Sequence, residues 1–540
     1  MFFRLHLLKK WPLWLAILIV LVAVAIVEYH VLAYTHGVFS YPFDDAYIHL
    51  AISKNLAFHG VWGVSDQEFS SASSSLLYPI LMAAAIKIFG ATTWVPLLLN
   101  VIPAITLLIV VQRWLDRQDI KQLGQFLMLL VLIVLAPLPA VIIFGMEHTF
   151  QLLFCFLFIY QFSDALGKIV TSDKKDQHLP FNVYVYGMLV VATRYEGVFI
   201  IAPACLLLLW RRRWVLAWEL GLIACLPILL FGFFSLFKGS YFIPNSVVVK
   251  SGAPPMTFKG IRDFLLGDGI RTLYHAHNSI GGTAVQWLLF ILPVSYLLFI
   301  RTIQRIGSYG YIILILTACT FMHLLFARTG TLYRYEVYLT GGTTPVLTVL
   351  FAREGRRIFL DKPQGARWVL VFIGLFLIAP LLQRSWYATK ILIRGSINIY
   401  DQQYQMGLFL HQYYDRASIA SCDIGAISYL THTKNMDLEG LGTLDVAKSR
   451  KENYRTPAFL NWLARRDSVK IAVIFDAEYG YYLYKDWKKV ATWQISRNMV
   501  CYSDVVTFYA LDTTEGPLLR KNLQTFQPKL PKDVLVTYYP

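Results

Sequence analysis

Two adjacent aspartates, Asp44 and Asp45, are the residues of this chain best suited to acid–base chemistry. They follow the first long apolar stretch, and their flanking residues would keep them close to a membrane surface. A carboxylate near a bilayer is costly to desolvate, so a pair of them at this position indicates a functional site. Burial and a neighbouring carboxylate both raise the pKa of an acid, which suits a general base.

A structural interpretation of the same pair is also open. A helical pattern over residues 47–57 follows the two acids directly. They would therefore stand at a helix N-terminus, where the backbone dipole favours negative charge. A capping role and a catalytic role can coexist, and the sequence alone distinguishes neither the roles nor the two aspartates.

Further ionisable side chains recur at the expected outer ends of apolar stretches. Arginine suits a phosphate, because its planar guanidinium donates paired hydrogen bonds. Plainer interpretations are that Arg194 pairs with Glu196, that Arg334 pairs with Glu336, and that Lys250 is a solvated lysine. The candidate binding residues are Glu147, His148, Arg194, Glu196, Lys250, Tyr333 and Arg334.

Composition and hydropathy assign the chain to the polytopic membrane proteins. It has 540 residues, 56% of them hydrophobic, and its mean hydropathy is +0.52. Apolar stretches of about 20 residues can cross a bilayer as helices, and about eleven candidates are found. They are residues 12–34, 93–112, 124–144, 149–166, 182–193, 197–210, 214–236, 285–300, 309–326, 337–352 and 367–384. Residues 182–210 could instead form one long helix broken near Arg194.

Positive charge orients these spans. Lysine and arginine concentrate in cytoplasmic loops, and a cytoplasmic N-terminus puts the densest clusters, including residues 211–213 and 353–357, on that side. Residues 75–89 then form a juxtamembrane or re-entrant helix rather than a crossing. The first span is too long for a signal-peptide core and is expected to remain as an anchor. The net charge of +16 thereby serves topology and contact with lipid headgroups, and nucleic-acid binding is not expected.

The chain changes character after the last span. Residues 1–385 are expected to form the transmembrane domain, and residues 386–540 an extracytoplasmic α/β domain. Residues 418–425 are expected to form a buried strand that leads into a turn and a helix, and residues 470–476 and 505–511 further strands. Cys422 and Cys501 could form a disulfide if this part is exported. Four aromatic residues of the C-terminal domain could bind an acceptor glycan or fill the core; they are Tyr479, Tyr481, Tyr482 and Trp487.

In their order along the chain, the motifs resemble the GT-C superfamily of polyprenyl-phosphate-sugar glycosyltransferases, and within it the branch of the mycobacterial terminal arabinofuranosyltransferase. The matching segments are residues 43–57, 70–78, 145–148, 193–197, 243–247, 333–335, 423–427 and 436–441. The resemblance implies inverting transfer of a sugar, with a pentofuranose such as arabinose as a candidate, from a polyprenyl-phosphate donor to a cell-envelope glycan or glycolipid. Asp44 or Asp45 would be the base, Arg194 and Arg334 would neutralise the donor phosphate, and Glu147 would bind sugar hydroxyls.

The resemblance also implies a multi-pass protein of the bacterial inner membrane, active on the extracytoplasmic side. Tyr195 departs from the family pattern, where many relatives carry proline. Some relatives need a divalent cation, but this chain lacks an Asp-x-Asp pair, so an obligatory metal is not expected. His275 and His277 are interpreted as polar loop residues.

Two other functional classes remain as alternatives. A transporter or flippase could use the same charges as a conduction path, although transporters usually show inverted repeats and charges near the bilayer midplane. A structural or assembly protein would explain the C-terminal domain but would leave Asp44 and Asp45 without a function.

Overall fold

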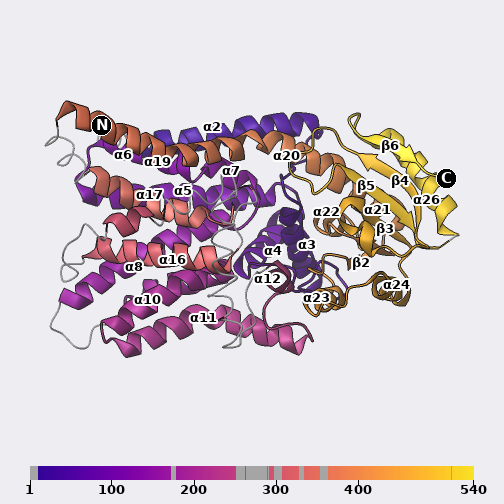
Figure 1. Ribbon diagram of the computed structural model, residues 1–540, viewed down its shortest axis with the longest axis horizontal. Coiled ribbons are helices and arrows are strands. Elements are labelled where there is room, and N and C mark those ends of the chain that lie inside the picture. Colours follow the sequence, from indigo (N-terminus) through magenta and orange to yellow (C-terminus); the bar gives the residue numbers. More distant parts are fainter. Residues whose placement is uncertain are drawn as a thin grey trace.

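A bundle of apolar helices with a mixed sheet at one end makes up the computed structural model of this chain (Figure 1). The structure describes residues 10–171, 178–250, 262, 289, 291–296, 307–327, 332, 334–352, 363–512 and 514–540. The N-terminal end of the described chain lies far from the sheet, and the C-terminus lies on it.

Within the described residues, five helices are long and apolar enough to cross a membrane. They are α2 (Trp11–Tyr34), α5 (Val95–Leu115, continued by η1, Asp116–Gln118), α8 (His148–Thr171), α11 (Trp214–Phe237) and α16 (Ser308–Phe326). Shorter apolar helices are α4 (Leu77–Phe89), α6 (Gln122–Leu135), α9 (Phe181–Thr193), α10 (Val198–Trp210) and α17 (Val337–Leu350). Large apolar side chains cover the outside of α11, where Trp218, Phe233 and Phe237 are exposed, as expected of a surface that faces lipid.

Most of the predicted spans coincide with helices, with two informative differences. The predicted helix 124–144 is divided at Pro137 into α6 and α7 (Leu138–Ile143), because proline lacks the N–H that would continue the ladder. The last predicted span, 367–384, belongs to a longer helix, α19 (Gln364–Lys390). The predicted span 285–300 lies largely outside the described residues.

The segment that could have been one broken helix forms two short antiparallel ones. Helix α9 ends beside Glu147 at the start of α8, since Arg194 contacts that carboxylate. Helix α10 runs back to the end of the bundle opposite Glu147, where Arg211 donates to the hydroxyl of Tyr311 at 2.8 Å. A single-turn 3-10 helix, η2 (Tyr195–Gly197), joins the two.

Helices α3 (Asp44–His59) and α4 lie between the bundle and the sheet (Figure 1). Neither begins with a side-chain hydrogen bond from its own N-cap residue. The short helix α12 (Asn245–Lys250) lies at the same level, beside α23 (Leu444–Lys451) of the sheet region. Within this layer, α3 carries Asp44, Asp45 and His49.

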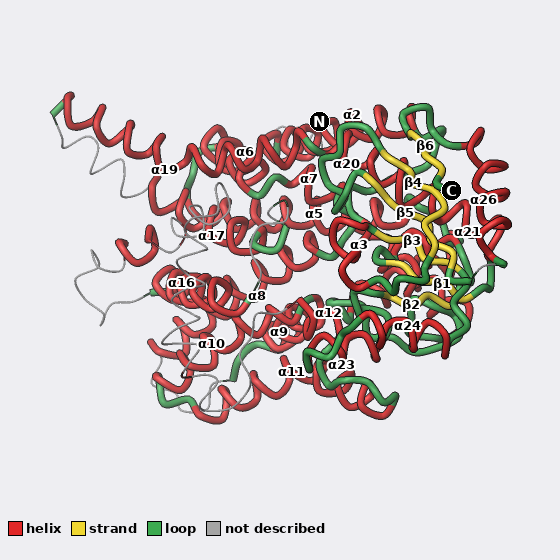
Figure 2. Tube along the Cα trace, turned by 45° about the vertical axis from the view of Figure 1, so that its right-hand side comes forward, coloured by secondary structure: helices red, strands yellow, loops and turns green. Residues whose placement is uncertain are grey.

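The C-terminal region is a six-stranded sheet with the order β2-β1-β3-β5-β4-β6 (Figure 2). Strands β1 (Ser418–Ser421), β2 (Lys434–Asp437) and β3 (Ile471–Ile474) are parallel. Strands β4 (Lys488–Gln494), β5 (Val505–Ala510) and β6 (Leu535–Tyr538) complete it in antiparallel fashion. The three predicted strand segments are therefore confirmed in β1, β3 and β5.

Helices cover both faces of this sheet. One core, around Phe409, Trp493 and Phe508, packs α21 (Gln405–Tyr414) and α26 (Glu515–Phe526) against it. The other, around Leu460 and Ile474, packs α23 and α24 (Pro457–Arg466) on the opposite face. The other helical elements of the region are α20 (Leu392–Ile399), η6 (Tyr400–Tyr404), α22 (Gly425–Leu430), α25 (Asp476–Tyr479), η7 (Gly480–Tyr482) and η8 (Gln527–Lys529).

The two C-terminal cysteines are free thiols in this structure. Cys501 contacts the Oε1 of Gln403, and Cys422 contacts the carbonyl of Val473. The disulfide considered from the sequence is therefore not formed. The domain division at residue 385 falls inside α19 and stays a prediction.

We expect the sheet and the Arg211–Arg213 loop to lie on opposite sides of the membrane. A cysteine introduced as Tyr481→Cys on the exposed surface should react with a membrane-impermeant maleimide in intact cells. A cysteine introduced as Arg212→Cys should react only after permeabilisation. Labelling of the parent protein measures the reaction of its native cysteines and serves as the control. The reverse labelling pattern would contradict the topology.

Candidate active site

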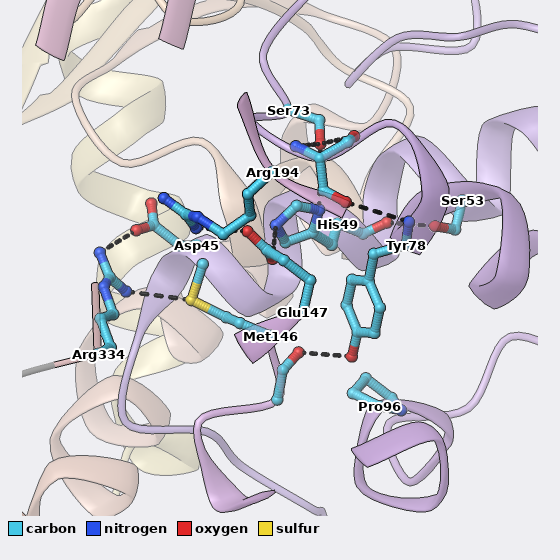
Figure 3. Close-up of polar contacts among 12 residues, drawn as sticks. Asp45, His49, Ser53, Ser73, Tyr78, Pro96, Met146, Glu147, Arg194 and Arg334 are labelled. Atoms are coloured by element: carbon cyan, nitrogen blue, oxygen red, sulfur yellow. Dashed lines mark hydrogen bonds and ion pairs between the residues drawn. The ribbon is translucent and has the colours of Figure 1, made fainter. Parts of the chain in front are cut away.

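Charged side chains from four distant segments meet at the end of the bundle that faces the sheet (Figure 3). Asp45 and His49 come from α3, and Glu147 precedes α8. Arg194 separates α9 from η2, and Arg334 precedes α17. Six of the predicted site residues therefore lie in one neighbourhood; they are Asp45, Glu147, His148, Arg194, Glu196 and Arg334.

Asp45 forms an ion pair with Arg334. The Oδ2 atom of the aspartate lies 2.5 Å from a terminal nitrogen of the guanidinium. The aspartate side chain keeps 22% of its surface exposed, whereas Arg334 is almost fully buried. Asp45 is also the second residue of α3, where the helix dipole favours a negative charge. The result is an accessible carboxylate held in a fixed position.

Aromatic and sulfur groups surround the guanidinium of Arg334. It lies 4.2 Å from the ring centre of Phe43 and 4.9 Å from that of Tyr335. One terminal nitrogen also donates to the hydroxyl of Tyr335 at 3.0 Å, and the other contacts the sulfur of Met146 at 3.1 Å. A thioether is a weak acceptor. That side of the guanidinium is therefore weakly bound.

The neighbouring Asp44 points to different partners. Its two carboxylate oxygens accept the backbone N–H groups of Gly425 and Ala426, at 2.6 and 2.8 Å. Asp44 thereby caps α22 of the sheet region. Burial, with the carboxylate of Asp423 close by, raises the pKa of Asp44 well above its usual range, while the two amides oppose this shift. The geometry supports the capping interpretation for this aspartate.

Gly425 is required for that contact. A Cβ atom at this position would lie 2.1 Å from the carbonyl oxygen of Asp44 and 2.7 Å from one of its carboxylate oxygens. No side chain fits at such a distance, so only glycine lets α22 approach α3 this closely. The glycine of the predicted motif 423–427 has a physical reason in this approach.

Glu147 is the centre of a second, deeper ion-pair network. It is fully buried, and its oxygens lie 2.5 Å from Arg194 and 3.1 Å from the Nε2 atom of His49. Burial alone would raise the pKa of Glu147, but the charges of His49 and Arg194 hold it well below its usual range. A buried carboxylate that pairs with an arginine remains ionised.

Arg194 joins this network to Arg334. Besides Glu147, it donates to both carboxylate oxygens of Glu196, at 2.8 and 3.2 Å. Its guanidinium also lies 5.3 Å from the ring of Tyr335, which contacts Arg334 as well. The pairing of Arg194 with Glu196 that the sequence left open is therefore present. Both carboxylates occupy the donors that a phosphate would use.

The serine-rich segment Ser70–Ser75 supports the network from outside. The hydroxyl of Ser73 lies 3.4 Å from the Nδ1 atom of His49. The hydroxyl of Ser71 accepts the backbone N–H of Asn245, at the start of α12, at 3.3 Å. Small hydroxyl residues suit this segment because it passes between three elements and bonds to each in turn.

Not every predicted residue takes part in described contacts. The ring of His148 lies edge-on to Tyr335, and within the described chain neither of its nitrogens has a hydrogen-bond partner. Lys250 ends α12, and its side chain lies outside what the structure describes. Tyr333, His275 and His277 also lie outside the described residues.

Four residues of the site did not emerge from the sequence: His49, Ser73, Met146 and Tyr335. His49 carried a usable signal, because it lies four positions after Asp45 and a helix puts such residues on one face. Tyr335 and Met146 adjoin predicted residues. The contact of Met146 with Arg334, and the position of Tyr335 between Arg194 and Arg334, depend on tertiary structure that spacing does not reveal.

Comparisons with known proteins agree with this architecture at the level of the fold. Residues 396–509 match a family described as Domain of unknown function (DUF8728). No curated protein matches the sequence. The crystal structure of ArnT from Cupriavidus metallidurans bound to undecaprenyl phosphate aligns over 93% of this chain and 98% of its own, with a TM-score of 0.52 and 11% identity. The apo structure of the same protein aligns over the same shares, with a TM-score of 0.49 and 12% identity.

At this identity the first match to ArnT shows a shared fold. An ArnT-like fold with multiple apolar helices indicates an integral membrane protein. The similarity extends through both the helical bundle and the sheet, since it covers nearly the whole of each chain.

We expect Asp44 to be a structural residue and Asp45 to be dispensable for folding. Asp44→Asn leaves one of two backbone N–H groups without an acceptor, so it should lower the free energy of unfolding by about 2 kcal/mol. Asp45→Asn keeps an oxygen for Arg334 and should cost less than about 1 kcal/mol. Thermal unfolding in detergent measures both. Equal stability of the two variants would contradict the division of roles.

The low pKa of Glu147 predicts a pH dependence of stability. Since its pKa is lower in the folded chain than the usual 4.5, its pairing contributes fully above that value and is lost as the pH falls through the folded pKa. Glu147→Gln should therefore lower stability at neutral pH by about 3 kcal/mol and flatten the loss on acidification. The exposed Glu452→Gln is the matched control. Parallel melting curves for the parent and Glu147→Gln over this pH range would exclude the role.

Proposed function

We propose that this protein is an inverting membrane glycosyltransferase that uses a polyprenyl-phosphate sugar as donor. The acceptor is a cell-envelope glycan or glycolipid on the extracytoplasmic side of the bacterial inner membrane. One observation carries the proposal: an accessible carboxylate, Asp45, paired with a buried arginine, in a fold shared with a protein solved with undecaprenyl phosphate. The motif resemblance to GT-C transferases supports the same chemistry.

Asp45 is the proposed general base. Its carboxylate takes the proton of the acceptor hydroxyl as that oxygen attacks the anomeric carbon of the donor. The bond from the anomeric carbon to the phosphate oxygen breaks, and the polyprenyl phosphate leaves with the bonding pair. Attack from the side opposite the phosphate gives inversion. Asp45 suits this role better than Asp44, whose two oxygens already accept backbone amides.

Arg334 is the proposed ligand of the donor phosphate. Its contact to the sulfur of Met146 is weak, and within the described chain its Nε has no hydrogen-bond partner. A phosphate oxygen can replace the sulfur at this terminal nitrogen with a charge-assisted hydrogen bond, while the other terminal nitrogen keeps Asp45. Arg194, held by two carboxylates, is instead proposed to fix Glu147 and the ring of Tyr335.

The transferred sugar and the metal requirement stay open to experiment. The proposal retains a pentofuranose such as arabinose as the first donor to test, on the motif resemblance alone. It also retains the expectation that no divalent cation is required, because Arg334 can supply positive charge at the phosphate. Transfer measured with and without a chelator tests the second point.

We expect Asp45→Asn to lose at least about 100-fold in transfer rate, the usual contribution of a general base. The assay offers purified protein several polyprenyl-phosphate sugars with envelope glycan acceptors and measures both glycosylated product and released polyprenyl phosphate. The exposed Asp486→Asn is the control. A parent-like rate from Asp45→Asn would refute the assignment, and release of no lipid phosphate by the parent would favour a transporter.

We further expect Arg334→Ala to weaken binding of undecaprenyl phosphate more than Arg194→Ala does. The reason is that only Arg334 has an edge free of carboxylates. Removing a charged hydrogen bond to the phosphate should reduce affinity by about 10- to 100-fold. Binding of the lipid to folded, monodisperse variants tests this. An equal or larger loss of affinity in Arg194→Ala would reverse the two roles.

A further inference from the structure

A polar cavity of about 400 Å³ lies where the serine-rich segment, the end of α11 and the sheet region meet. Its walls come from both parts of the chain. Glu68, Ser70, Lys238 and Asn245 belong to the helical part, whereas Asp445 and Arg466 belong to the sheet part. A cavity built by two parts of one chain, with convergent polar groups, is the common form of a ligand site.

The charges on these walls balance. Three cations, Lys238, Lys434 and Arg466, face three anions, Glu68, Asp445 and Asp467. Several already pair: Arg466 lies 2.7 Å from Asp445 and 3.0 Å from Asp467. With no net charge, the cavity does not attract an ion. It offers many donors and acceptors to a neutral ligand rich in hydroxyl groups.

An aromatic row extends from this cavity along α24 to the residues before it, with Trp462 and Tyr454 exposed and Phe459 half-buried between them. Arg466, on the cavity wall, lies 5.3 Å from the ring of Trp462. Trp462 in turn lies near Phe459, and Phe459 near Tyr454, with ring centres 5.9 and 5.2 Å apart. The side chain of Trp462 is 55% exposed. Flat, exposed rings bury the apolar face of a sugar, while their rims leave its hydroxyls in water.

These aromatic residues differ from those considered in the sequence. Tyr479 and Trp487 are buried in the core of the sheet region. Tyr481 is 88% exposed but is not a residue of the cavity wall.

The cavity also lies within reach of the proposed active site. Ser70 lines the cavity, and Ser73, three residues further, contacts His49 of the Glu147 network. Three extended residues span at most about 11 Å. A chain of sugars held in the cavity can therefore direct one end towards α3.

We propose that this cavity, with the aromatic row of Tyr454, Phe459 and Trp462, binds the acceptor, and that the acceptor is a neutral glycan. The inference rests on the proposed transferase function, since the bound glycan would supply the hydroxyl that Asp45 deprotonates. It selects a neutral polysaccharide over a phosphorylated glycolipid, because the walls carry no excess of positive charge.

Direct binding tests this independently of transfer. Purified protein is titrated with neutral arabinan, galactan and mannan oligosaccharides and with an anionic oligogalacturonate of matched length, by calorimetry or saturation-transfer NMR. At least one neutral oligosaccharide should bind, and the oligogalacturonate should bind more weakly. Trp462→Ala should reduce the affinity for the neutral oligosaccharide by about tenfold, the effect of removing one apolar sugar contact. Tyr481→Ala, which removes an even more exposed ring that is not on the cavity wall, should leave it unchanged.

Three outcomes separate the two proposals. Stronger binding of the anionic oligosaccharide, or equal affinity in the parent and Trp462→Ala, overturns the glycan site even if transfer occurs. No binding of any neutral oligosaccharide also overturns it. Neutral binding that Trp462→Ala weakens, in a protein that releases no lipid phosphate, sustains the glycan site and refutes the transferase.

Discussion

Buried charge at the end of an apolar bundle is the constraint on which this structure depends. Glu147 has no exposed surface, and the guanidinium of Arg194 and the imidazole of His49 make its ionised form tolerable. Those two partners come from helices that are far apart in the sequence. Their pairing therefore fixes how α3, α8 and α9 meet, and it does so beside the accessible Asp45.

Two adjacent acids serve two purposes because a helix turns by about 100° at each residue. Asp44 points to the sheet region and caps α22, whereas Asp45 points to Arg334. The contact that docks the sheet is thus covalently next to the proposed base. A single peptide unit therefore separates the contact with α22 from the contact with Arg334.

Much of the architecture could be predicted from the sequence, for physical reasons. Hydropathy marks most helices, because a lipid-facing helix must be apolar along its length. Short strand patterns bounded by turn residues mark β1, β3 and β5. Hydropathy does not reveal that the helix is divided at Pro137, since a proline inside an apolar stretch sometimes only bends a helix. The site was predicted as a set of residues at one depth. The pairing of Arg194 with Glu147 depends on tertiary contacts, and so does the thioether beside Arg334. A single amino-acid sequence gives no access to such contacts.

The most direct test of the central claim is a structure of the protein with undecaprenyl phosphate bound. The account predicts that the phosphate takes the edge of Arg334 now occupied by the sulfur of Met146, with Asp45 facing the space next to it. Arg194 should keep both of its carboxylates. A phosphate bound to Arg194 in place of Glu147 or Glu196, or bound away from Arg334 altogether, would contradict the account.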